Sequence, residues 1–154
     1  MERNKFLSMD SRALCLLPAL AVALACAPAS AAKLFRGPVE AVVVEVLDGD
    51  TFLAEAIVWP GHSVRVNIRI RGIDAPEMKA RCNAERVAAE KAREALASLF
   101  GAGPIAISNI SGAKYYGRVL ADVTTADGQG VASILLGEKL VRPYGGGRRE
   151  AWCD

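Results

Sequence analysis

Two short acidic segments of this sequence lie where extended, β-branched segments end. Residues 48–51 (Asp-Gly-Asp-Thr) follow the apolar run at residues 39–47, and residues 74–77 (Asp-Ala-Pro-Glu) follow the alternating run at residues 63–73. Carboxylates placed close together repel one another unless a cation lies between them, and hard oxygen ligands suit Ca²⁺ or Mg²⁺ better than zinc. The two segments therefore indicate a candidate cation site, although Asp-Gly-Asp by itself is commonly only a turn.

Two arginines accompany these acidic segments. Arg69 lies shortly before Asp74 on the polar face of the alternating run, and Arg118 lies near the start of another predicted strand. Arginine binds phosphate oxygens in a bidentate manner, a bound metal polarises a further oxygen, and a remaining carboxylate can take a proton from water. This combination of side chains predicts phosphoryl chemistry.

The elements that must position these residues follow from hydrophobic periodicity and from turn residues. Strands are expected at residues 39–47, 51–58, 63–73, 105–110 and about 117–125, and helices at residues 83–100 and 131–140. Short strands leave open edges unless they close into a small barrel. We therefore expect a β-rich α+β fold, a five-stranded OB-fold barrel with a helix between strands three and four and a short C-terminal helix.

Two patterns predict which faces of these elements are buried. Along residues 63–73, alternate apolar residues are expected to face the core: Val64, Val66, Ile68 and Ile70. Along residues 83–100, one stripe is expected to pack inward: Ala84, Ala88, Ala92, Ala95, Leu96 and Leu99. The other face of the strand carries arginines, and either solvent or the backbone of a substrate would meet Arg65 and Arg71 there.

Residues 1–32 predict a secretory signal peptide, and residues 33–154 predict one domain. Basic residues precede an apolar segment at residues 13–25, and small residues after it offer a cleavage site. This segment is shorter than the roughly 20 residues that span a bilayer. An uncleaved anchor helix and a lipoprotein attached through Cys26 are the alternatives. We expect an exported protein, periplasmic or secreted, in which residues 33–38 form a short linker.

The cysteines of the predicted domain become interpretable if the chain is exported. Cys82 and Cys153 would then lie in an oxidising space, where an even pair commonly forms a disulfide. Two free thiols are the alternative. A zinc site is disfavoured, because one histidine, His62, and two distant cysteines cannot supply four ligands.

Composition limits the classes of function further. The chain of 154 residues allows one ordinary domain, and its 52% hydrophobic content excludes a disordered polyanion. The formal net charge of +2 excludes a strongly polybasic nucleic-acid binder. Affinity for a polyanion would have to come from local clustering of basic side chains.

Three segments of the chain resemble the motifs of the staphylococcal-nuclease-like (thermonuclease) family. They are residues 46–51 (Val-Leu-Asp-Gly-Asp-Thr), residues 69–77 (Arg-Ile-Arg-Gly-Ile-Asp-Ala-Pro-Glu) and residues 116–118 (Tyr-Gly-Arg). Their order and spacing resemble the family over residues 39–144. The resemblance implies an OB-fold barrel and a Ca²⁺-dependent nuclease that hydrolyses phosphodiester bonds of DNA and RNA with little sequence preference.

The resemblance also implies a set of metal ligands. Asp50 and Asp74 would bind Ca²⁺ through their side chains. Ala75 stands where the family often has threonine, and it would bind through its backbone carbonyl, which the change to alanine leaves intact. Asp48 would support the metal site from behind the ligands.

The resemblance implies catalytic roles as well. Glu77 matches the residue that acts as general base or positions the water, and Arg69 and Arg118 match the two phosphate-binding arginines. Tyr116 would line the nucleotide pocket. The chain departs from the family at Lys114, where an acidic residue is usual, so the geometry of that loop is open.

The competing hypothesis is a non-catalytic OB-fold module that binds oligonucleotide, oligosaccharide or protein, because barrels of this kind serve many roles. Under the leading hypothesis the partner is nucleic acid, DNA and/or RNA, bound as substrate. We then expect a monomer with no stable protein partner and no membrane span after cleavage. Arg148 and Arg149 either extend a phosphate-binding track or belong to a soluble tail, and the tail is favoured.

Overall fold

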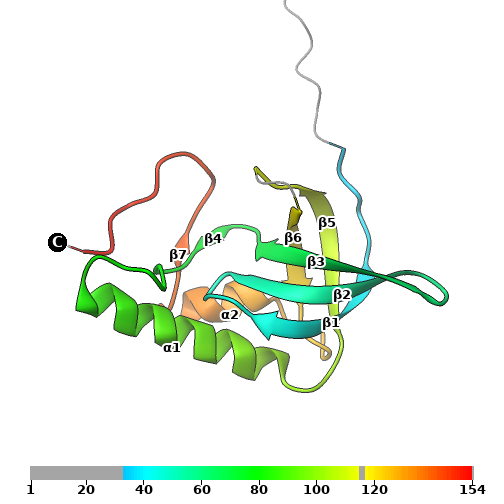
Figure 1. The fold of residues 1–154 in the computed structure, drawn as a ribbon, viewed down its shortest axis with the longest axis horizontal. Coiled ribbons are helices and arrows are strands. Elements are labelled where there is room, and N and C mark those ends of the chain that lie inside the picture. Colours follow the sequence, from blue (N-terminus) through cyan, green and yellow to red (C-terminus); the bar gives the residue numbers. More distant parts are fainter. Residues whose placement is uncertain (1–32, 115–116, 154) are drawn as a thin grey trace, which may run out of the picture. The chain divides into compact units, whose positions relative to one another are not determined.

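Five strands close into a barrel in this computed structural model, which describes residues 33–114 and 117–153. The predicted leader and Tyr116 lie outside the described residues. Around the barrel the strand order is β1, β2, β3, β6, β5 (Figure 1). The strands are β1 (Val39–Val46), β2 (Thr51–Trp59), β3 (His62–Ile70), β5 (Ile105–Gly112) and β6 (Arg118–Thr124).

The barrel is mixed, because its strands run in both relative directions. Neighbouring strands pair antiparallel except β3 and β6, which pair parallel. Helix α1 (Asn83–Phe100) precedes β5, and helix α2 (Val131–Gly137) follows β6. The predicted β-rich α+β architecture, with a closed five-stranded barrel and two helices, is therefore confirmed. Neither helix in the described part of the chain is long and apolar enough to cross a membrane.

The strand predicted at residues 63–73 is two elements. β3 ends at Ile70, and a turn at Gly72, whose φ is +83°, leads into the short strand β4 (Ile73–Asp74). Glycine adopts this left-handed backbone readily, so the chain can change direction here. β4 pairs antiparallel with β7 (Arg142–Pro143) outside the barrel, which sets Asp74 beside the C-terminal segment.

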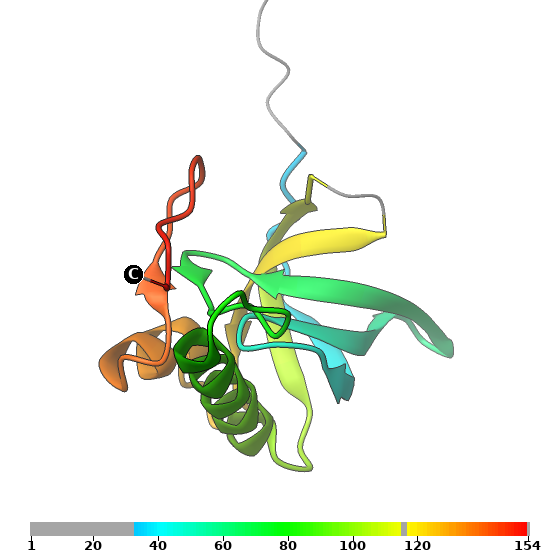
Figure 2. The ribbon, with the colours of Figure 1, turned by 60° about the vertical axis from the view of Figure 1, so that its left-hand side comes forward.

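The hydrophobic core fills the barrel and the space between it and the helices. Inward-facing residues from the strands are fully buried: Phe52, Ile68, Ile70, Ile105 and Ile107. Leu96 and Phe100 of α1 close one side of this core, and the Phe100 ring lies 4.6 Å from that of Phe52. Figure 2 shows α1 and α2 side by side below the barrel.

Two of the predicted burial patterns need correction. Val64 is 48% exposed, because the hairpin of β2 and β3 extends beyond the barrel, as Figure 1 shows. In α1, Ala84 is exposed and the buried stripe is Glu85, Ala89, Ala92, Leu96 and Phe100. The stripe thus begins with a carboxylate, which no apolar pattern would have indicated.

The segment predicted as a linker is partly paired. Phe35 forms an isolated antiparallel bridge with Ile110, with N–O distances of 2.8 and 2.7 Å. Part of residues 33–38 therefore continues the antiparallel β1–β5 pairing before the start of β1.

The cysteine pair is disulfide-bonded, as predicted. Cys82 lies just before α1 and Cys153 lies near the end of the chain, with their Cα atoms 6.0 Å apart. The bond ties residues 144–153, which we call the C-terminal arm, to the beginning of α1.

The tight packing of the β1–β2 turn leads to a stability prediction. A Cβ atom at Gly49 would lie 2.6 Å from the Cβ of Ala92 and 2.9 Å from that of Ala75. Gly49→Ala should therefore lower the free energy of unfolding by about 1–3 kcal/mol, the usual cost of overpacking. Denaturant unfolding measures this.

Gly137→Ala is the matched control for that substitution, because a Cβ there meets nothing within 4 Å. It should leave the free energy of unfolding unchanged or raise it, since alanine favours helix. Equal effects of the two substitutions would contradict the close packing at Gly49.

Candidate functional site

The β1–β2 turn and the end of β3 lie side by side, and this brings Asp50 to Arg69. Thr51 is the register partner of Arg69 in the β2–β3 pair. The carbonyl of Asp50 accepts a hydrogen bond from the backbone N–H of Ile70 at 2.8 Å, which continues this pairing by one residue. Strand pairing therefore positions both side chains.

Asp50 is nearly fully buried, with 2% of its surface exposed. Its carboxylate accepts hydrogen bonds from the Thr51 hydroxyl at 2.8 Å, from the Ala75 backbone N–H at 2.9 Å and from the Arg69 guanidinium. Burial raises the pKa of Asp50 to about 6; Arg69 and the hydrogen bonds oppose the rise, and the charge of Asp48 adds to it. The ionised form thus requires nearby positive charge.

Asp48 fixes the backbone of the turn that presents Asp50. Its Oδ1 accepts the Asp50 backbone N–H at 3.0 Å. The backbone N–H groups of Leu47 and Asp48 both donate to the Thr51 carbonyl, at 3.0 and 3.1 Å. A short polar side chain that bonds to its own backbone is typical of such turns.

Arg69 connects two carboxylates. One of its terminal nitrogens donates to Asp50, and the other donates to Asp74 Oδ1 and to the Ile73 carbonyl, both at 3.2 Å. Asp74 is buried like Asp50, so this guanidinium compensates two buried negative charges at once. Its Cζ also lies 6.0 Å from the centre of the Tyr144 ring.

A second guanidinium, that of Arg149, reaches the same acidic residues from the C-terminal arm. Its Nε lies 2.5 Å from Asp74 Oδ1, its Nη1 bonds to Glu77 and its Nη2 donates to the Ala75 carbonyl at 3.0 Å. Partial burial alone would lower the pKa of Arg149, but the hydrogen bonds to Glu77 and Asp74 outweigh it and raise that pKa. The soluble-tail interpretation of Arg149 is therefore wrong.

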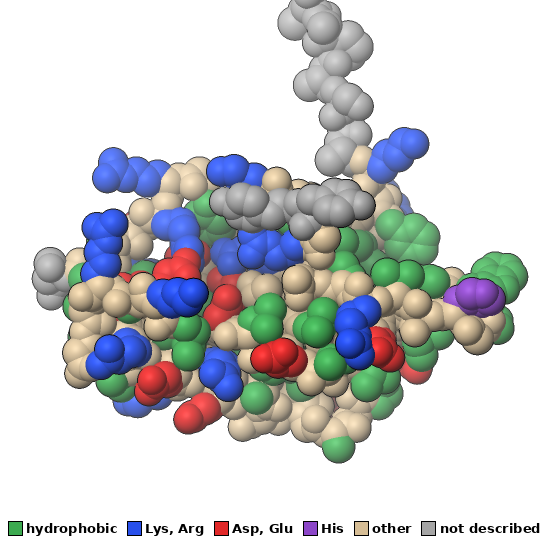
Figure 3. All heavy atoms as spheres, in the orientation of Figure 1, with side chains coloured by type: hydrophobic (Ala, Val, Ile, Leu, Met, Phe, Trp, Pro, Cys, Tyr) green, Lys and Arg blue, Asp and Glu red, His purple; other side chains and the backbone are tan. Residues whose placement is uncertain are grey.

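A cavity of about 850 Å³ opens beside these residues. Most of the site predicted from sequence lines it: Asp48, Asp50, Arg69, Ala75, Glu77 and Arg118. Asp74 lines a smaller neighbouring cavity of about 200 Å³. Lys114 and residues 145–147 of the C-terminal arm complete the large cavity. Figure 3 shows basic and acidic side chains gathered on this face, between β3 and the arm.

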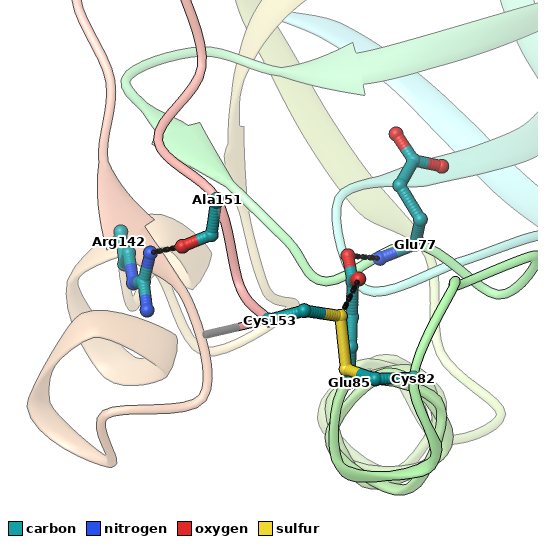
Figure 4. The surroundings of a disulfide bond; sticks show 6 residues. All are labelled: Glu77, Cys82, Glu85, Arg142, Ala151 and Cys153. Atoms are coloured by element: carbon teal, nitrogen blue, oxygen red, sulfur yellow. Dashed lines mark hydrogen bonds between the residues drawn. A yellow bond between two sulfur atoms is a disulfide. The ribbon is translucent and has the colours of Figure 1, made fainter.

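The disulfide lies directly behind the Glu77 segment. Glu85, in the first turn of α1, accepts the Glu77 backbone N–H at 3.1 Å, and its other oxygen lies 3.2 Å from Cys153 Sγ (Figure 4). The Glu77 carboxylate points away from this contact. Cys82, Glu85 and Cys153 are grouped closely enough to suggest a metal site, but both sulfurs are bonded to each other and carry no thiolate to donate.

Two arginines of β3 and the following turn have other roles. Arg65 pairs with Glu55 at 2.9 Å on the exposed hairpin. The Arg71 Nη2 donates to the carbonyls of Asn109 and Leu120, at 2.5 and 3.1 Å, so Arg71 links barrel strands although it also lines the cavity.

Sequence reasoning missed Arg149, Glu85 and Tyr144 as neighbours of the site. Arg149 had a usable signal, because Cys153 follows it closely and Cys82 lies shortly after Glu77. A Cys82–Cys153 bond requires the arm to return to the site. Neither Glu85 nor Tyr144 had such a signal.

Comparison with known proteins gives no match to any protein-family model and none to a curated protein. The family resemblance of the three motifs therefore stays a prediction, and the function must be argued from the site itself.

The raised pKa of Asp50 gives a pH prediction for the protein kept free of divalent cations with EGTA. The folded state holds this proton with a pKa of about 6, against 3.8 for an unperturbed carboxyl. The folded state therefore binds more protons between these values, and stability falls as the pH rises from about 4 to 6. The free energy of unfolding of the wild type, less that of Asp50→Asn, should fall by roughly 2–3 kcal/mol between pH 4 and pH 7 in denaturant unfolding.

Asp127 provides the control for this measurement, because its pKa is shifted in the opposite direction from that of Asp50. Hydrogen bonds from Thr125 and Gln129 lower the pKa of this exposed carboxyl. The stabilising contribution of Asp127 is lost as the pH falls. The free energy of unfolding of the wild type, less that of Asp127→Asn, should therefore rise as the pH rises. A difference for Asp50→Asn that is flat or rises with pH would contradict the burial argument.

Proposed function

We propose that this protein is a Ca²⁺-dependent nuclease that hydrolyses phosphodiester bonds of DNA and/or RNA with little sequence preference. The observation that carries the proposal is the convergence of carboxylates and arginines on one open cavity. Asp50, Glu77, Arg69 and Arg118 line this cavity, and Asp74 is bonded to Arg69 beside it. Buried carboxylates next to guanidiniums in an open cavity suit an anionic substrate bound with a cation.

We further propose that the barrel is an OB-fold and that the protein is exported after removal of a leader at residues 1–32. The closed strand order, with parallel pairing only between β3 and β6, supports the first point. The disulfide between Cys82 and Cys153 supports the second, since such bonds persist in oxidising compartments.

The oxygens around Asp50 fit a hard divalent cation in their chemistry. Asp50, Asp74 and the Ala75 carbonyl are oxygen donors on buried residues, and the two carboxylates require compensating charge. These groups would hold Ca²⁺, which when bound polarises a phosphate oxygen and stabilises charge that develops on it. The Ala75 carbonyl and Asp74 now accept hydrogen bonds from Arg149, so the cation would replace that guanidinium.

The chain's own residues supply the remaining chemistry. The side chain of Glu77 is 53% exposed at the cavity, where its carboxylate can take a proton from an attacking water. Arg69 and Arg118 line the same cavity, and their guanidiniums would bind the phosphate and stabilise its charge in the transition state. The backbone bond from Glu77 to Glu85 restrains the position of the base.

A non-catalytic binding module of the same fold is the second candidate. The Arg149 contact favours it, because two guanidiniums already compensate the acidic residues without an external cation. Such a module would bind an oligonucleotide, an oligosaccharide or a protein at the barrel without hydrolysis.

A nuclease assay separates the two candidates. The purified, disulfide-bonded protein should hydrolyse DNA or RNA in millimolar Ca²⁺ and stop when EGTA is added. Glu77→Gln should lower kcat by about 10²–10⁴, the usual contribution of a general base. Glu40→Gln is the matched control, since Glu40 is exposed on β1 and does not line the cavity, and it should retain the wild-type rate.

An unchanged rate in Glu77→Gln would remove the role of Glu77. Binding of nucleic acid without hydrolysis in the wild type, at any Ca²⁺ concentration, would support the binding module instead.

A further inference from the structure

The C-terminal arm places a positive charge where the proposed function places a cation. We propose that Arg149 is an internal cation that occupies the candidate Ca²⁺ site, so the arm must leave the site before the metal can bind. The inference rests on the proposed function, because it assumes that the acidic residues bind a divalent cation. It goes beyond that function by assigning an autoinhibitory contact to the arm.

Arg149 contacts two of the three candidate ligands and the candidate base. Its guanidinium uses three nitrogens on three different groups, namely Asp74, Glu77 and the Ala75 carbonyl. A surface arginine paired by chance would meet one carboxylate, and its side chain would be freely solvated. Here the Asp74 partner is 4% exposed, and the arginine side chain itself is 38% exposed.

Electrostatic repulsion prevents the Arg149 guanidinium and Ca²⁺ from occupying the site at the same time. The guanidinium charge already lies within hydrogen-bond distance of Asp74 and the Ala75 carbonyl, and a divalent cation on the same oxygens would meet a like charge a few ångströms away. Because the two states exclude each other, the apparent affinity for Ca²⁺ equals the intrinsic affinity multiplied by the fraction of molecules in which the arm is open.

The arm is held at both of its ends. At its start, β7 pairs with β4, with Arg142 opposite Asp74. At its end, the Cys82–Cys153 disulfide is joined by a bond from Arg142 to the Ala151 carbonyl at 2.9 Å and by the Trp152 ring, which lies 3.8 Å from the Arg142 Cζ. This tether keeps Arg149 at a high effective concentration next to the acidic residues.

The middle of the arm has backbone that can change direction. Gly146 and Gly147 have φ values of +103° and +91°, a region that residues with a Cβ rarely adopt. The Tyr144 hydroxyl donates to the Gly147 carbonyl at 2.7 Å, which folds the glycine segment over the cavity. The arm is therefore built as a loop between two fixed ends, with Arg149 between the glycines and the disulfide.

A different role for Arg149 would predict a different result. If Arg149 were a third phosphate-binding arginine, its loss would weaken nucleic-acid binding and leave Ca²⁺ affinity unchanged or lower. If Arg149 instead occupies the cation site, its loss should raise the affinity for Ca²⁺, because a competing positive charge is removed. The sign of the change in Ca²⁺ affinity separates the two roles.

Calorimetric titration of the full, disulfide-bonded protein with CaCl₂, without nucleic acid, tests the inference. Arg149→Gln should lower the apparent dissociation constant for Ca²⁺ by about tenfold or more, the factor expected if the arm is closed in nine molecules of ten. Arg149→Lys retains the positive charge, so its dissociation constant for Ca²⁺ should be closer to that of the wild type. Arg148 lines the small cavity with Asp74 but bonds to none of the three groups that Arg149 contacts, so Arg148→Gln controls for charge near the site without direct contact. It should strengthen Ca²⁺ binding far less than Arg149→Gln does.

The tether is tested by Cys82→Ser combined with Cys153→Ser. This pair should also strengthen Ca²⁺ binding, and Arg149→Gln should then add less than it does in the disulfide-bonded protein. Thermal unfolding gives a second readout: Ca²⁺ should raise the midpoint of Arg149→Gln more than that of the wild type, because the metal restores the missing compensation.

Equal dissociation constants for the wild type, Arg149→Gln and Arg148→Gln would overturn the inference and leave the proposed cation site intact. An equal gain in Arg148→Gln would overturn it as well, because general charge removal would then explain the effect. Absence of Ca²⁺ binding and of a midpoint shift in every variant would overturn both the inference and the proposed function.

Discussion

Compensation of two buried carboxylates is the constraint on which this site depends. Asp50 and Asp74 are brought together by the β1–β2 turn and by β4, and both are nearly inaccessible to water. Two negative charges this deeply buried are costly unless positive charge and hydrogen bonds reach them. Arg69 reaches both and Arg149 reaches one, so the contacts of these two arginines with the buried carboxylates follow from the placement of Asp50 and Asp74.

The barrel and α1 make that placement possible. The close approach of the β1–β2 turn to Ala92 of α1 leaves no room for a side chain at Gly49, and this fixes the position of Asp50. The Ala75 backbone N–H donates to the Asp50 carboxylate, so Asp50 holds the segment after β4 in place. In the proposed metal site, the carbonyl of the same Ala75 would be a ligand beside Asp50. Packing and charge compensation are thus parts of one arrangement.

Hydrophobic periodicity was sufficient for the elements with long, regular patterns. Helix α1 has the predicted bounds, and the barrel strands differ from prediction mainly at their ends. The pairing of β4 with β7 was not predicted, because two residues cannot display a period. Val64 follows the alternation of β3 but lies outside the barrel, since local pattern carries no information on where a hairpin leaves the core.

The residues of the site also divide into those that local sequence pattern indicates and those that it does not. The convergence of Asp50, Arg69, Glu77 and Arg118 on one cavity could be predicted. Arg69 and Arg118 lie on strands, Asp50 directly precedes β2 and Glu77 follows shortly after β4, and strand pairing brings such positions together. The position of Arg149 depends on the return of the C-terminal arm to the site, and in the sequence only the Cys82 and Cys153 pair indicates that return. This position has a physical advantage, because an internal guanidinium lets Asp74 be buried before any metal is present. If the proposed cation site is correct, the same contact opposes the metal, and stability of the metal-free fold and affinity for the cation would be coupled through one side chain.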